Sequence, residues 1–305
     1  MPKTLIIIVG PTAVGKTNIG IEIAKHYKTE IISADSRQFF RETTIGTAKP
    51  SEEELLAVKH HFINSHSITQ DFSVGHYEKQ ALETLNHIFS EHDYAVMVGG
   101  SGLYVNAVIN GFDELPEIDI TVRNTLNKKL KEQGISPLQQ ELEKIDPEYY
   151  QTADVNNPQR VIRALEVFYS SGKPFSSFRT GIKRKRAFKI VLIGLNMDRE
   201  KLYDRINQRV DIMIEQGLID EVKSLIPYQN LNSLNTVGYT EIFDYLNGNI
   251  NLERAVELVK QNSRRYAKRQ ITWFKKVEGI KWFEPNQKED IISYIEYETM
   301  SSLYF

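Results

Sequence analysis

The most constraining feature of this chain is the segment Gly10-Pro-Thr-Ala-Val-Gly-Lys-Thr17, which has the spacing G-x-x-x-x-G-K-[ST]. The apolar run Leu5 to Val9 precedes it, and a helical pattern from Thr17 to Tyr27 follows it. A strand, a glycine-bearing turn and a helix in this order direct backbone N–H groups and the helix dipole at one point. The lysine adds a positive charge there, and the threonine hydroxyl can bind Mg²⁺. We therefore predict a phosphate-binding loop formed by Gly10, Pro11, Thr12, Ala13, Val14, Gly15, Lys16 and Thr17.

Three further apolar segments are typical of buried strands, at 30–33, 94–98 and 189–195, and helical patterns separate them. From 113 to about 185 the sequence is polar and helical, with no strand-like run. This order predicts an α/β fold, a doubly wound parallel P-loop sheet with a helical insertion domain. We place the catalytic core at 1–112 and 187–305 and the insertion at 113–186.

Composition excludes several classes of protein. The 305 residues contain no cysteine, so neither disulfides nor thiolate zinc sites can form. No apolar run approaches the roughly 20 residues that a membrane-spanning helix needs. We therefore expect a cytoplasmic protein with no membrane contact.

The segment Ala34-Asp-Ser-Arg-Gln38 follows the second predicted strand, and Asp35 is its first charged residue. Ligands of doubly wound sheets bind at the carboxyl ends of the strands, so Asp35 should lie near the phosphate loop. There it would bind Mg²⁺ or accept a proton; the alternative is a surface turn residue that caps a helix. The third strand ends in Gly99-Gly100 and not in the Mg²⁺-binding aspartate of ordinary P-loop NTPases, which argues against that class.

Basic residues are clustered although the net charge is only −2. Lys268 and Arg269 belong to a run between 260 and 276 that has no acidic residue, and another group lies at 183–186. Such clusters are typical of polyanion-binding surfaces, and the alternative is a solvated helix face. Arg205 and Arg209 are spaced to share one helix face, where a phosphate would relieve their repulsion. The adjacent pair His60-His61 lacks metal-ligand spacing, so we assign it a structural role.

Several motifs together resemble one family. They are Gly10 to Thr17, Asp35-Ser36, Ile45-Gly-Thr-Ala-Lys-Pro50, Val98-Gly-Gly-Ser-Gly-Leu-Tyr104, Asn157-Pro-Gln-Arg-Val-Ile-Arg-Ala-Leu-Glu166, Gly238-Tyr239 and Ala267-Lys-Arg-Gln-Ile-Thr-Trp273. In this order they closely resemble the bacterial members of the tRNA isopentenyltransferase family, the tRNA dimethylallyltransferases. The departures are small, with Ser101 where threonine is usual and Asn157 where aspartate is usual.

The resemblance implies transfer of a dimethylallyl group from dimethylallyl diphosphate to N6 of the adenosine 3′-adjacent to the anticodon, position 37, of tRNA, with Mg²⁺. It implies that Asp35 accepts the N6 proton while Lys16, Thr17, Mg²⁺ bound to Thr17, and Arg209 stabilise the leaving diphosphate. It also implies contacts between the tRNA anticodon stem-loop and Asp35, Ser36, Arg37, Gln38, Ser101, Arg123, Gln159, Arg160, Val161, Ile162 and Arg163, to which we add Lys268 and Arg269 from the basic run. We expect a monomer.

Three other functions share parts of this pattern. A small-molecule kinase would use the same loop with ATP as donor, and an RNA-binding protein with a vestigial loop would use neither donor. An adenylate isopentenyltransferase would use the same donor with a free nucleotide as acceptor. The basic run and the insertion favour tRNA, because a small acceptor needs no extended surface.

Overall fold

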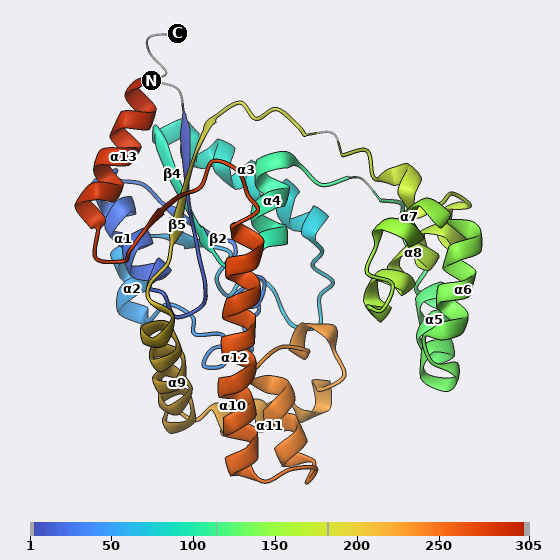
Figure 1. The fold of residues 1–305 in the computed structure, drawn as a ribbon. Coiled ribbons are helices and arrows are strands. Elements are labelled where there is room, and N and C mark those ends of the chain that lie inside the picture. The colour runs from blue at the N-terminus through green and yellow to red at the C-terminus, as the bar shows by residue number, and fades with distance from the viewer. Residues whose placement is uncertain (1–2, 114, 182, 302–305) are drawn as a thin grey trace. The chain divides into compact units, whose positions relative to one another are not determined.

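The computed structural model describes residues 3–113, 115–181 and 183–301. The chain forms two compact units, which we call the first unit, residues 1–109 and 185–305, and the second unit, residues 110–184. Figure 1 shows strands in the first unit alone and a group of helices in the second.

The first unit is built on a six-stranded sheet in the order β3-β2-β4-β1-β5-β6. All neighbouring strands are parallel. The strands are β1 Thr4–Val9, β2 Ile31–Ser33, β3 His60–His61, β4 Tyr94–Gly99, β5 Lys189–Leu195 and β6 Lys281–Phe283. The predicted fold class, a parallel α/β sheet that begins with a phosphate loop, is confirmed.

The helices of the first unit cover both faces of this sheet (Figure 1). They are α1 Lys16–His26, α2 Glu52–Ala57, α3 Val74–Glu91, α4 Gly102–Asn110, α9 Arg199–Glu215, α10 Leu218–Ser224, α11 Tyr239–Leu246, α12 Leu252–Phe274 and α13 Lys288–Ser301, with α4 ending at the boundary of the two units. Short 3₁₀ turns lie at Ile226–Tyr228 and Asn232–Leu234.

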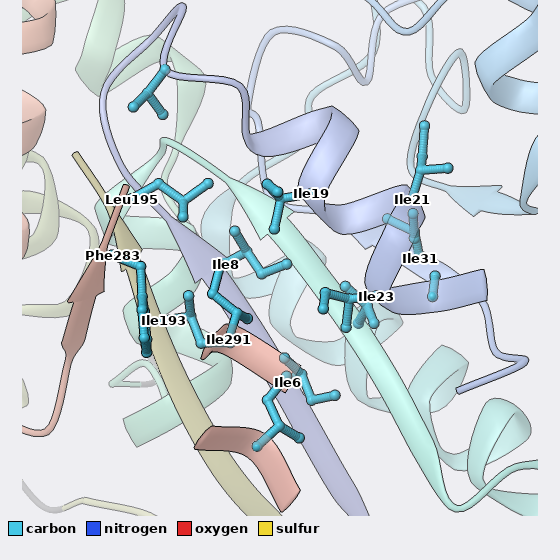
Figure 2. Close-up of a cluster of buried hydrophobic side chains, with 14 of the residues drawn as sticks. Ile6, Ile8, Ile19, Ile21, Ile23, Ile31, Ile193, Leu195, Phe283 and Ile291 are labelled. Carbon is cyan, nitrogen blue, oxygen red and sulfur yellow. The ribbon is translucent and has the colours of Figure 1, made fainter. Parts of the chain in front are cut away.

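Strand β1 is the centre of the hydrophobic core, because it has a strand on each side and helices on both faces. Ile6 and Ile8 face α1, α9 and α13, and Figure 2 shows them beside Ile19 and Ile291. Leu5, Ile7 and Val9 face α3 and α4 on the opposite side. An unbroken apolar run is what a strand buried on both faces requires, since neither face meets water.

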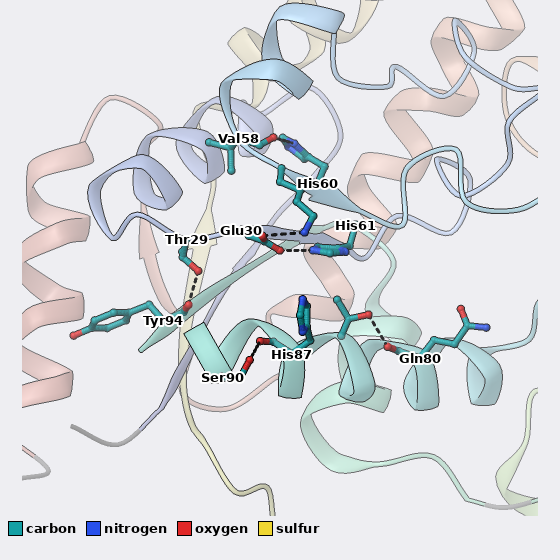
Figure 3. Close-up of polar contacts among 11 residues, drawn as sticks. Thr29, Glu30, Val58, His60, His61, Gln80, His87, Ser90 and Tyr94 are labelled. Carbon is teal, nitrogen blue, oxygen red and sulfur yellow. Dashed lines mark hydrogen bonds and ion pairs between the residues drawn. The ribbon is translucent and has the colours of Figure 1, made fainter. Parts of the chain in front are cut away.

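Two edge strands lie outside the elements predicted from sequence. Strand β3 has only two residues, both histidines, in a segment for which we expected loop and helix. His61 Nε2 lies 2.6 Å from Glu30 Oε2, and Lys59 Nζ lies 3.0 Å from Glu30 Oε1 (Figure 3). Burial alone would raise the pKa of Glu30, but the hydrogen bonds from His61 and Lys59 lower it below its ordinary value. The His61 contact is structural, as its spacing suggested, because it joins the edge strand to the residue that precedes β2.

The second unit is helical and has its own buried core. Its helices are α5 Ile120–Gln133, α6 Ser136–Ile145, α7 Pro147–Thr152 and α8 Pro158–Ser171, followed by a 3₁₀ turn at Phe175–Phe178. Helix α8 begins with Asn157 accepting a hydrogen bond from the Gln159 N–H and with Pro158 in the first turn. Its apolar face packs against α5 and α6 through Leu126, Leu138 and Leu165.

Candidate active site

The phosphate loop joins β1 to α1 at the carboxyl edge of the sheet. Gly10 has φ 151° and lies so close to the Leu195 carbonyl that a Cβ would overlap it. Gly15, at φ 104°, is the residue before α1. Glycine is required at both positions, since a larger residue would be blocked at the first and strained at the second. The backbone thus has the tight path that lets N–H groups converge on an anion.

Lys16 folds back over this loop, where its Nζ donates a hydrogen bond of 2.7 Å to the Pro11 carbonyl. Burial lowers the pKa of Lys16 to about 8, the Asp35 carboxylate partly offsets this, and the Arg209 charge adds to the lowering. A buried ammonium with no carboxylate in direct contact is a strong binder of an incoming anion, because the anion restores the charge balance.

Two cavities open at this edge of the sheet, both within the first unit. The first, of about 400 Å³, is lined by the phosphate loop, and we call it the loop cavity. The second, of about 540 Å³, is lined by residues of α9, α11 and α12, and we call it the helix cavity. Both have the volume of a small-ligand site. The residues that line both cavities are Thr12, Asp35, Thr47 and Arg209.

Asp35 lies where the two cavities meet, as its position after β2 predicts. Its Oδ1 accepts a hydrogen bond of 3.0 Å from the Arg37 N–H, a contact within a turn and not the cap of a helix. A carboxylate oxygen has room for further partners, and this side chain also faces the space beside Lys16. Its arrangement therefore suits a group that accepts a proton or binds a metal ion.

Helix α9 borders both cavities. Arg205, Gln208 and Ile212 line the loop cavity, and Val210 and Met213 line the helix cavity. Residues three and four apart share a helix face, so the two sets lie on neighbouring faces. Arg209 belongs to both faces, which places its guanidinium beside the phosphate loop and beside Asp35.

The guanidinium of Arg209 is held by the loop itself. Its Nη2 donates a hydrogen bond to the Thr12 hydroxyl. Among the residues that the structure describes, its buried Nε has no hydrogen-bond partner. Burial lowers the pKa of Arg209, Asp35 opposes the shift and Arg205 adds to it, but an arginine stays charged at neutral pH. A buried cation beside the phosphate loop suits an anion that would balance its charge.

The turn at 44–48 forms the wall opposite α9. Its backbone N–H groups at Thr44, Ile45 and Gly46 all donate to the carboxylate of Glu221, over 2.8 to 3.1 Å. The Tyr239 hydroxyl donates to the same carboxylate at 2.6 Å, and its ring leaves no room for a Cβ at Gly46. Glu221 on α10 thereby fixes the turn that carries Thr47.

Residues 36–38, predicted to contact tRNA, hold the site together. Arg37 donates to the carbonyls of Asn232, Ser233 and Asn235. Gln38 Nε2 donates to the carbonyls of Thr47 and Ala48, at 3.2 and 3.1 Å. The Ser36 N–H donates to Ser101 Oγ at 3.0 Å, which brings the turns after β2 and β4 together. Arg37 and Ser36 nevertheless line the helix cavity.

The basic residues divide into internal and exposed ones. Arg186 is internal, since it donates to the Ala107 and Val108 carbonyls and pairs with buried Glu78 at 2.8 Å. Lys268 and Arg269 on α12 are exposed. The Arg269 guanidinium lies 5.7 Å from the ring centroid of Tyr266, which lines the helix cavity.

The predicted tRNA contacts of the second unit also differ in exposure. Gln159 and Arg160 are exposed in the first turn of α8. Arg123 and Arg163 both pair with buried Glu166, Arg123 through Nε and Nη2 at 2.6 and 3.1 Å. The remaining two, Val161 and Ile162, are buried in the core of this unit.

Sequence reasoning missed Gln270, Glu221 and Thr47 as parts of this site. Gln270 and Thr47 lie inside two of the motifs that carry the family resemblance. The sequence of those motifs does not indicate which residue each side chain contacts. Within the described residues, no helix is long and apolar enough to cross a membrane.

The fold and site define a P-loop α/β protein whose phosphate loop lines one cavity beside a second, larger cavity. The family model for IPP transferase matches residues 38–277. The chain belongs to the IPP transferase family.

Close relatives are similar over almost their whole length. The chain is 54% identical to a tRNA dimethylallyltransferase of Christiangramia forsetii, over 97% of this chain and 98% of that protein. It is 50% identical to a tRNA dimethylallyltransferase of Flavobacterium johnsoniae, over 99% and 100% of the two chains.

Two solved structures are similar as well. A tRNA isopentenylpyrophosphate transferase from Bacillus halodurans matches with a TM-score of 0.72 and 40% identity, covering 99% of each chain. A eukaryotic dimethylallyltransferase, whose structures capture it acting on tRNA, matches with a TM-score of 0.78 and 25% identity, over 97% of this chain and 80% of that one.

Proposed function

We propose that this chain transfers a dimethylallyl group from dimethylallyl diphosphate to N6 of adenosine 37 in tRNA and releases diphosphate. The observation that carries the proposal is the meeting of the two cavities at Asp35 and Arg209. A transfer reaction needs a donor site and an acceptor site that share the point where the bond forms. The activity named for the relatives supports this assignment.

The donor's diphosphate binds in the loop cavity. Loop N–H groups, Lys16, Arg205 and the guanidinium of Arg209 surround the phosphates. The donor set also suits Mg²⁺, since Thr17 and the Asp35 carboxylate line the same cavity. Bound there by Thr17 and phosphate oxygens, Mg²⁺ would supply positive charge to the leaving group.

The acceptor adenine enters the helix cavity, in which Asp35 is the carboxylate beside the donor. An adenosine next to the anticodon is stacked, so it must leave the stack to reach this cavity. The N6 nitrogen then forms a bond to C1 of the donor as the C1–O bond to diphosphate breaks. Asp35 takes the proton that N6 loses. Lys16 and Arg209 stabilise the negative charge that appears on the departing diphosphate.

The tRNA surface includes the exposed pair Lys268 and Arg269 in the first unit and exposed Gln159 and Arg160 in the second. We propose that the helical region, predicted at 113–186, binds the anticodon stem-loop. Arg123 and Arg163 contribute less as free cations, because both pair with Glu166, whose single negative charge offsets one of their two positive charges. The monomeric state and the cytoplasmic location stay predictions.

One experiment separates this function from its alternatives. Radiolabelled dimethylallyl diphosphate and labelled ATP are each offered with tRNA, with AMP and with no acceptor. Label from the prenyl donor should enter tRNA alone. Transfer to AMP would identify an adenylate isopentenyltransferase, and transfer of phosphate from ATP would identify a kinase.

A further inference from the structure

The Gln270 side chain joins the two glycine-rich turns of the site. It lies on α12 and is 5% exposed. Its Oε1 accepts a hydrogen bond of 2.8 Å from the Thr12 N–H in the phosphate loop. Its Nε2 donates one of 2.9 Å to the Gly100 carbonyl in the turn after β4. The amide oxygen and the amide nitrogen thus have one role each, since an amide carries an acceptor and a donor on one planar group.

Gly100 makes room for this amide. A Cβ at position 100 would overlap Gln270 Nε2, and the next nearest atoms outside that side chain, such as the Gly10 carbonyl oxygen at 3.6 Å, would not obstruct it. The absence of a side chain at 100 is therefore explained by the Gln270 contact. Gly100 carries no unusual backbone requirement of its own, since its φ is not in the left-handed region.

Thr12 contacts both Gln270 and Arg209. Its N–H is held by Gln270, and its hydroxyl accepts the hydrogen bond from Arg209 Nη2. Thr12 and Arg209 both line the two cavities. Gln270 therefore determines the position of Thr12, and Thr12 determines that of the guanidinium.

We propose that Gln270 is a positioning residue for the transfer reaction, which acts through Thr12 to hold Arg209 against the leaving diphosphate. The inference rests on the proposed function. Negative charge on the diphosphate increases as the C1–O bond breaks and is complete in the product. A displaced Arg209 should therefore weaken the transition state and the product complex more than the donor complex.

The first test is Gln270→Ala, with Gln261→Ala as the matched control, because Gln261 lies on the same helix and lines neither cavity. We expect kcat to fall about 10- to 100-fold, as for small misplacements of a catalytic group, with little change in donor KM. The affinity for inorganic diphosphate with Mg²⁺, measured by calorimetry, should fall, while Gln261→Ala keeps wild-type values. A role only in stability would lower the melting temperature and leave diphosphate affinity per folded molecule unchanged, and that result would overturn the proposal.

The second test uses paired variants. Gly100→Ala should reproduce the Gln270→Ala loss, because the added methyl displaces the amide, and should add nothing in a Gln270→Ala background. Gln270→Ala should likewise add nothing to Arg209→Ala. Independent, additive losses in diphosphate affinity would disprove the route through Thr12 and Arg209.

Diphosphate binding also separates this inference from the proposed function. A wild-type protein that transfers no prenyl group to tRNA would refute the function. The coupling among Gly100, Gln270 and Arg209 in diphosphate affinity would still decide the role of Gln270, since binding needs no turnover.

Discussion

Arg209 donates a hydrogen bond from Nη2 to the hydroxyl of Thr12, while its Nε has no partner within the described parts of the chain. Leaving a buried donor unpaired costs on the order of 1 to 3 kcal/mol. Because Nε is closed off from solvent, a diphosphate oxygen can relieve this cost only if the side chain shifts on binding. The Thr12 contact holds the guanidinium beside the phosphate loop in the free protein.

Arg209→Lys should keep the positive charge but lower the rate of transfer strongly. An ammonium cannot present the planar fork that reaches Thr12 with one N–H and the diphosphate with another. We expect kcat to fall about 10²- to 10³-fold, the loss typical for one donor to a developing anion. Single-turnover kinetics with saturating tRNA measure it, and a variant within a few-fold of wild type would exclude Arg209 from leaving-group stabilisation.

Asp35→Asn should reduce kcat about 10²- to 10⁴-fold, because the amide cannot accept the N6 proton. The amide oxygen can still cap the Arg37 N–H, so the turn should keep its shape. Donor affinity should change little, since the loop and Lys16 hold the diphosphate. If donor affinity instead collapses and excess Mg²⁺ restores activity, Asp35 is chiefly a metal ligand; a Mg²⁺ titration of kcat and donor Kd distinguishes the two roles.

Donor binding should weaken as the pH rises above about 8, the pKa to which burial lowers Lys16 in the free protein. A bound diphosphate favours the ammonium form and raises this pKa, so binding takes up a proton at pH 8 and above. Affinity should fall by at most about tenfold per pH unit there. Calorimetry in buffers of different ionisation enthalpy measures the proton uptake. Lys16→Arg is the control, because arginine keeps its charge over this range, and an identical pH profile for both proteins would contradict the prediction.

Salt should weaken tRNA binding steeply, and Lys268→Ala with Arg269→Ala should flatten the dependence of log Kd on log salt. The slope should fall by about one for each lost phosphate contact. Lys25→Ala is the matched control, since Lys25 is an exposed cation on α1. Equal slopes for the double variant and the control would mean that this part of α12 is only a solvated face.

Arg186→Met should destabilise the first unit strongly. Its ion pair with Glu78 is almost fully buried, and the substitution removes this pair together with the hydrogen bonds to the Ala107 and Val108 carbonyls. Breaking one side of a buried pair costs about 3 to 5 kcal/mol. Urea denaturation measures this change, and Lys185→Met, one residue earlier in the same basic group, is the control because its side chain is exposed. A loss below 1 kcal/mol would contradict the burial argument.

The central strands could be predicted from sequence because each is an apolar run bounded by turn residues, and burial on both faces permits little else. Strands β3 and β6 could not, because they have two and three residues and include histidine and lysine. At that length no periodicity exists to detect, and pairing with a neighbouring strand alone determines the conformation.

The position of Asp35 could be predicted because parallel strands bring their carboxyl ends to one edge. The role of Gln270 could not, because its partner Thr12 is 258 positions away in the chain. The phosphate loop can be recognised because its residues are contiguous in the sequence. The groups that orient its side chains lie on distant helices, where the residue spacing indicates only which face is apolar.

The sheet order also determines when the active site can exist. Strand β1 pairs with β5, so Thr4 lies beside Lys189, and the second unit is synthesised between them. At roughly 5 to 20 residues per second, one edge of β1 stays unpaired for about 10 to 40 s on the ribosome. An exposed apolar strand edge is a template for wrong pairing, and β1 has such an edge until β5 is available to pair with it. The second unit has its own core and can fold within that time, before the phosphate loop has a complete sheet behind it.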